Sequence, residues 1–106
     1  MSNNELIRKA FNDVCSAISN LEVAKHELAD LRAKSEMVKL TSETLENASR
    51  NYEPSNDIHE AVFIQHEKAK EEFDQFVNSN TKESIKNQLN SAFNATSEAQ
   101  SILKSI

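Results

Sequence analysis

The sequence contains no glycine and one proline, Pro54. Glycine most readily adopts the left-handed backbone conformations of tight hairpins and phosphate-binding loops, and it makes up about 7% of average proteins. A chain without glycine has few ways to reverse its direction within two or three residues. This composition favours long helices joined by very few loops, and it predicts an all-α protein.

The longest stretch without a turn signal runs from about residue 3 to residue 50. Its apolar residues alternate at spacings of four and three, which places them on one face of a helix. This apolar stripe includes Ile7, Phe11, Val14, Ile18, Leu21 and Leu28. We therefore expect a first helix over about 3–50. In the alternative, the helix breaks near 35–42, where serine and threonine oxygens compete for backbone hydrogen bonds.

Residues 51–56 carry the clearest loop signal, because Pro54 disfavours a helical conformation at Glu53. Two further helices are predicted, over about 57–77 and about 82–105, and their short connection predicts an antiparallel hairpin. The second helix is expected to bury a face that includes Ile58. The third is expected to bury its apolar row, which runs Ile85, Leu89, Ala92, Thr96, Ala99, Leu103 and Ile106 and is widened by Phe93. The expected architecture is a single domain, 1–106, in which a long helix and a helical hairpin form a three-helix bundle of coiled-coil type. A break in the first helix near 35–42 would give a four-helix bundle instead.

The expected helix lengths do not match. A helix over 3–50 would be roughly 70 Å long, whereas each later helix would be about 30–40 Å long. A hairpin docked beside the loop covers the 28–50 half of the first helix and leaves the other half in water. Each exposed large apolar residue would forgo about 1.5–3 kcal/mol of burial. We therefore expect a homo-oligomer, most simply a dimer, with its interface at Ile7, Phe11, Val14, Ile18 and Leu21.

The net charge is −5 and the basic residues are scattered, so direct binding to nucleic-acid phosphates is not expected. Acidic residues instead gather on the predicted second helix, with large apolar residues among them. An apolar anchor ringed by charge is typical of a protein–protein contact. The predicted partner-binding surface consists of Asp57, Glu60, Phe63, Ile64, Glu67 and Glu71.

No residue pattern in the sequence predicts catalysis or a cofactor. The histidines lack the Glu-x-x-His and His-x-x-x-His spacings of helical metal sites, so no metal is expected. Phosphate-binding loops and nucleophile elbows need glycine. The single cysteine, Cys15, agrees with a reducing compartment and is expected to be half-buried beside the stripe. Without a leader-like or membrane-spanning segment, we expect a cytoplasmic protein that has no membrane partner.

Two functional hypotheses follow. The first is a non-enzymatic helical protein-interaction module that oligomerises and inhibits, chaperones or scaffolds another protein, whose identity the sequence does not reveal. The alternative is an acidic mimic of nucleic acid that blocks a nuclease or a nucleic-acid-binding complex, of the anti-defence type carried by phages and mobile elements. Steep weakening of binding by salt would favour mimicry over apolar docking.

Overall fold

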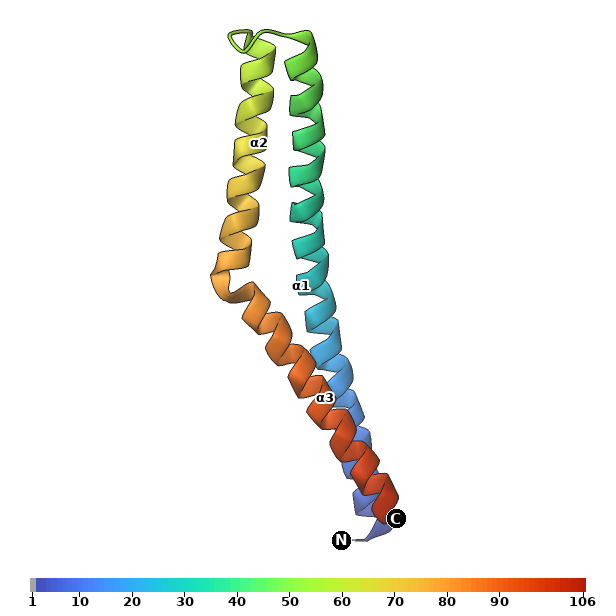
Figure 1. Cartoon of the computed structure of the whole chain (residues 1–106). Coiled ribbons are helices and arrows are strands. Elements are labelled where there is room, and N and C mark those ends of the chain that lie inside the picture. The colour runs from blue at the N-terminus through green and yellow to red at the C-terminus, as the bar shows by residue number, and fades with distance from the viewer. Residues whose placement is uncertain (1) are drawn as a thin grey trace. The chain divides into compact units, whose positions relative to one another are not determined.

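The structure, a computed structural model, describes residues 2–106 and contains helices but no strands in that range. The helices are α1 (Asn3–Asn51), α2 (Asp57–Phe76), a short π-helical segment η1 (Val77–Thr81) and α3 (Lys82–Ser105), as Figure 1 shows. The prediction of an all-α protein is confirmed. Each observed helix begins and ends within a residue or two of the range expected from the sequence.

Helix α1 is continuous over 49 residues, so the alternative in which it breaks near 35–42 is wrong. The hydroxyl groups in that region do not interrupt the helix. Thr41 Oγ1 donates to the carbonyl of Met37 at 2.8 Å, and Thr44 Oγ1 donates to that of Leu40 at 2.9 Å. These side chains add a second bond to carbonyls four residues back while the backbone stays helical. At the start of α1, the Glu5 amide donates to Ser2 Oγ at 3.2 Å.

Local side-chain and backbone features set the ends of the later helices. Asn56 caps α2 by accepting a bond from the Ile58 amide at 2.9 Å. Between α2 and α3, Ser79 and Asn80 leave helical backbone angles, and Asn80 has φ 65° and ψ 10°. This is the left-handed region, which asparagine adopts more readily than most non-glycine residues. The break expected at 78–81 therefore rests on Asn80.

The chain divides into two compact units, and α1 contributes to both. Unit 1 comprises the chain up to Leu28 and Lys82–Ile106, and unit 2 comprises Ala29–Thr81. In unit 1, α3 runs antiparallel to the first part of α1; in unit 2, α2 runs antiparallel to the second part (Figure 1). We expected α2 and α3 to form a hairpin over the 28–50 half of α1. Instead, each packs on its own part of α1, an arrangement that gives both halves of the long helix a neighbour.

The two helices of unit 1 meet along a row of alanines. Ala10, Ala17 and Ala24 of α1 are 6%, 3% and 2% exposed and lie seven residues apart, at one heptad position. Their buried counterparts on α3 are Ile85, Ala92, Ala99 and Ile102. Side chains as small as alanine let two helix backbones approach closely. We call the seam these buried positions together with the half-buried ones between them on the same face, namely Leu6, Asp13, Asn20 and Glu27 of α1 and Gln88 and Ala95 of α3. Among the described residues, no large side chain is completely buried.

The predicted stripe of unit 1 is therefore not the buried one. Ile7, Phe11 and Ile18 each follow a seam residue by one position, which rotates them about 100° away from α3. On α3, Leu89 and Leu103 were likewise expected to face the core but remain exposed. Neighbouring rows of a helix have the same 4-and-3 spacing, and the row of alanines closes the seam because it permits the shortest distance between helices.

The seam of unit 2 is more polar. His66 Nδ1 and Thr41 Oγ1 lie 2.9 Å apart, and His59 Nε2 and Ser49 Oγ lie 3.0 Å apart. One end of this seam holds Lys34, whose Nζ is 5.3 Å from the centre of the Phe76 ring, a cation–π distance. Ile58, which was expected to face the core, is 51% exposed. Hydrogen bonds to histidine thus replace part of the apolar burial expected here.

Candidate interaction surfaces

Unit 1 has large, exposed apolar side chains on both of its helices. Each follows a seam position by one residue, and each is between 42% and 70% exposed. We call this set the apolar face, and it consists of Ile7, Phe11, Val14, Ile18, Leu21, Leu28, Leu89, Phe93 and Leu103. The structure thus brings the five predicted oligomer-interface residues together with residues of α3 that the sequence had assigned to the core.

The apolar face lies on one side of the helix pair. In an antiparallel pair, the residues directly after seam positions lie on one side of the seam in both helices. The residues directly before seam positions lie on the opposite side. Lys9 and Glu98 precede Ala10 and Ala99, and they form an ion pair of 2.9 Å. This ion pair marks the second side as polar. The residues that precede seam positions are polar between 9 and 26 on α1, with the exception of Val23, and between 84 and 101 on α3. They include Asn12 and Asn94.

The predicted partner-binding residues of α2 are all exposed. Asp57, Ile64 and Glu71 are seven residues apart and lie opposite the seam row that contains His59 and His66. The exposed fraction of Ile64 is 57%, and that of Phe63, nearer the seam, is 46%. We call the predicted set, Asp57, Glu60, Phe63, Ile64, Glu67 and Glu71, the acidic surface.

The charge of the chain is carried by unit 2. Unit 1 contains six acidic and six basic side chains, namely Glu5, Asp13, Glu22, Glu27, Glu83 and Glu98 with Arg8, Lys9, Lys25, Lys82, Lys86 and Lys104. The whole chain has 17 acidic and 12 basic residues, so unit 2 keeps 11 acidic and six basic ones. Unit 1 is therefore neutral, and unit 2 has the entire net charge of −5.

One ion pair perturbs a titratable group in unit 1. The hydrogen bond from Lys9 to Glu98, together with the negative charge of that carboxylate, raises the pKa of Lys9 above its usual value of 10.5. Two seam carboxylates have an oxygen without a hydrogen-bond partner among residues 2–106, namely Asp13 Oδ2 and Glu27 Oε2. The other oxygen of Glu27 accepts a bond from Ser84 at 2.9 Å. These two carboxylates lie at the seam of unit 1, fourteen residues apart along α1.

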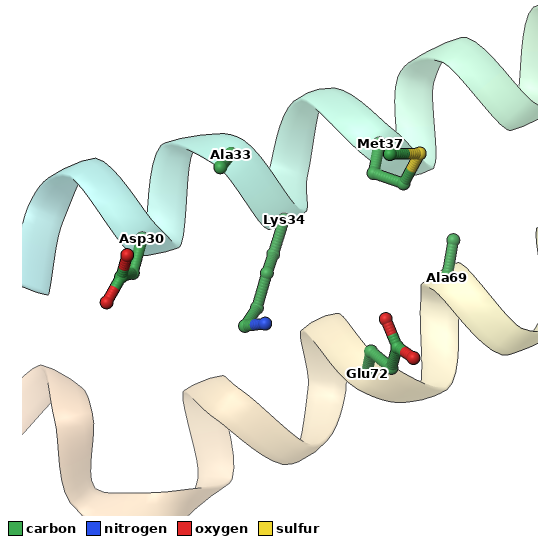
Figure 2. Close-up of a pocket in the computed structure, with 6 residues that line it drawn as sticks. All are labelled: Asp30, Ala33, Lys34, Met37, Ala69 and Glu72. Atoms are coloured by element: carbon green, nitrogen blue, oxygen red, sulfur yellow. The ribbon is translucent and has the colours of Figure 1, made fainter.

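A depression of about 230 Å³ lies between α1 and α2 in unit 2 (Figure 2). Lys34 extends from α1 toward α2, and the small Ala69 side chain leaves space opposite Met37. Its remaining lining residues are Asp30, Ala33 and Glu72. Small-molecule sites usually have volumes of about 300–1,000 Å³ and a mostly apolar lining. This depression is smaller and contains three charged side chains, so it does not have the character of a ligand pocket.

Among residues 2–106, no three His, Cys, Asp or Glu side chains lie close enough together to hold a metal ion. Cys15, expected to be half-buried, is an exposed free thiol, because it lies outside the seam. Within the same range, the structure contains no helix with a segment both long and apolar enough to span a membrane. The chain matches no family model, no curated protein and no solved structure.

The contribution of α3 to the apolar face was not expected from the sequence. Leu89, Phe93 and Leu103 were assigned to the core side of that helix, together with the alanines that do lie there. The repeat of alanine at seven-residue intervals on α1, and again at Ala92 and Ala99, was the available signal. A row of alanines facing another row of alanines is typical of a close helix pair, and it leaves the neighbouring apolar row free.

Proposed function

We propose that this protein is a non-enzymatic helical interaction module that acts by binding another protein. The observation that carries the proposal is the apolar face of unit 1. A monomeric soluble protein rarely exposes a contiguous apolar patch larger than a few hundred Å², and larger patches are typical of protein-binding sites. Here nine large apolar side chains gather on one side of a two-helix unit. In the proposed role, the protein inhibits, chaperones or scaffolds the partner that it binds.

The acidic surface of α2 supports a second contact, with a basic partner. Its carboxylates are exposed on a unit that holds the entire net charge of −5, so they attract positive surfaces over a longer range than isolated charges do. Exposed Phe63 and Ile64 add apolar anchors. This concentration of charge also favours the second candidate function, in which the acidic helix occupies the nucleic-acid groove of a nuclease or another nucleic-acid-binding protein.

A comparison of three immobilised full-length proteins tests the proposal against a lysate of the organism that encodes it. One is the wild type, one carries Phe11→Glu and Phe93→Glu, and one carries Glu60→Lys, Glu67→Lys and Glu71→Lys. We expect a partner protein that the wild type retains and that one of the variants loses. Identical sets of captured proteins on all three columns would refute the proposal.

The salt dependence of capture separates the two candidate functions. Raising the ionic strength from 0.1 M to 1 M shortens the Debye length from about 10 Å to about 3 Å. A nucleic-acid mimic is expected to release its partner over this range, and excess DNA or RNA is expected to displace it. A module that docks through apolar side chains is expected to keep its partner in high salt, because burial of apolar surface is not screened by ions.

A further inference from the structure

We propose that a second copy of this chain covers the apolar face, so that unit 1 of each copy packs face to face with the other and the two form a four-helix bundle. This inference rests on the proposed function in taking the apolar face as a protein-binding surface. With that face filled by a second copy, the acidic surface remains for a different protein. The proposal also changes the form of dimer expected from the sequence. That dimer paired α1 alone with another chain, whereas the structure places residues of α1 and α3 in one shared surface.

The apolar face is two helices wide, which matches a second copy of the same unit. Apolar residues from two adjacent antiparallel helices form a layer with one polar and one apolar side. Such a layer is half of a four-helix bundle, in which two pairs of helices enclose a common core. A single foreign helix would fill the groove between α1 and α3 and leave the outer residues, such as Phe11 and Phe93, in water. A second copy brings a layer of the same width and the same apolar rows.

The area of the apolar face also fits a second copy. Nine large side chains that are each about half exposed present on the order of 900 Å² of surface per copy. A stable interface of standard size buries about 800 Å² per partner. The apolar face is therefore comparable in area to one side of a standard interface, without a contribution from unit 2.

The apolar face is nearly free of charge. Between Ile7 and Leu21 on α1, and between Leu89 and Leu103 on α3, its rows contain no charged residue, and Lys25 is the one charged residue in the row before Leu28. Thr96 and Gln100 are the polar residues in those rows. Depletion of charge is the compositional mark of an interface core. Unit 1 as a whole is neutral, so two copies can approach without net repulsion, whereas two copies of unit 2 would repel each other.

Sedimentation equilibrium of the full chain tests the inference between about 0.5 and 100 μM, a range that spans common dimer affinities. The wild type is expected to show twice the chain mass of 11.9 kDa at the upper end. A variant with Phe11→Glu and Phe93→Glu is expected to dissociate with a Kd raised at least about 100-fold, since the two aromatic anchors of the face become charged in each copy. Its helix content, measured by circular dichroism, is expected to match that of the wild type.

The matched control carries Asn12→Glu and Asn94→Glu. It adds the same charges one residue further along each helix, on the polar side of unit 1, and is expected to remain dimeric. The inference is overturned by a wild type that stays monomeric at 100 μM, by a dimer that survives Phe11→Glu with Phe93→Glu, or by equal dissociation of the control. A monomeric wild type that still captures another protein through Phe11 and Phe93 would overturn the dimer and leave the proposed function standing.

Discussion

The row of alanines in unit 1 gives the sharpest test of how α1 and α3 pack. Ala17 is 3% exposed and lies on the side of α1 that faces Ala92 and its neighbours. Replacing Ala17 with leucine adds one methine and two methyl carbons at a point where the two helices are held together by small side chains. Alanine and leucine have similar helix propensities, so the local helix is not weakened by the change. The effect of the substitution therefore reports the space between the helices.

Overpacking of a close seam costs about 1–3 kcal/mol, because the helices must separate or the new side chain must adopt a strained rotamer. For a chain of this size, 1 kcal/mol lowers the melting temperature by roughly 4–8 °C. We expect Ala17→Leu to lower the free energy of unfolding by about 1–3 kcal/mol, measured in urea titrations followed by circular dichroism. Ser16→Leu is the matched control, because Ser16 is exposed on the polar side and its replacement leaves the seam unchanged.

The opposite result would refute the packing described for unit 1. If the large apolar stripe of α1 were the buried one, residue 17 would face outward and leucine would be tolerated there as well as at residue 16. Equal stability of Ala17→Leu and the wild type, at matched protein concentration, would therefore show that α3 does not pack on the alanines. Matched concentration is necessary because association of two copies would itself add stability.

Three further predictions concern single residues. Asn80→Ala is expected to destabilise the protein by about 1 kcal/mol and Asn80→Gly to have little effect, because the left-handed backbone conformation penalises a Cβ-bearing residue; urea midpoints distinguish the two. Lys9→Met is expected to lower the urea midpoint at neutral pH. Because Glu98 raises the pKa of Lys9, the wild type is more stable than this variant by the full amount below pH 10.5. This difference in stability disappears as the pH rises through the raised pKa of Lys9. Asp13→Ala is expected to raise stability by about 1 kcal/mol relative to Asn12→Ala, because it removes a carboxylate oxygen without a partner in the described seam.

The ends of the helices were predictable because they depend on nearby residues. Ser2 and Asn56 provide side-chain oxygens to the first turns of α1 and α2, and Pro54 stands in the loop between them. Each of these effects acts within three or four residues. The exposed carboxylates of α2 could be located for a similar reason, since seven-residue spacing alone brings Asp57 and Glu71 onto one row.

The choice of buried row was not predictable from apolar periodicity. Ala10 and Phe11 belong to neighbouring rows with the same spacing, and an apolar scale ranks the row containing Phe11 higher. The structure buries the other row because packing depends on the distance between backbones as well as on the hydrophobicity of each side chain. The pairing of α3 with the first part of α1 is also a property of tertiary packing, which a pattern within one helix does not contain.

The alanine-lined seam also determines how stability changes with temperature. The heat capacity of unfolding grows with the apolar surface that becomes exposed, and it averages about 12–15 cal/mol/K per residue in globular proteins. Buried alanines release little such surface, and the largest apolar side chains of unit 1 are already in water within a single copy. The free energy of unfolding of one copy is therefore a shallow function of temperature. Stabilisation by apolar burial weakens on cooling, and a seam that buries little apolar surface loses less stability in the cold than a large apolar core does.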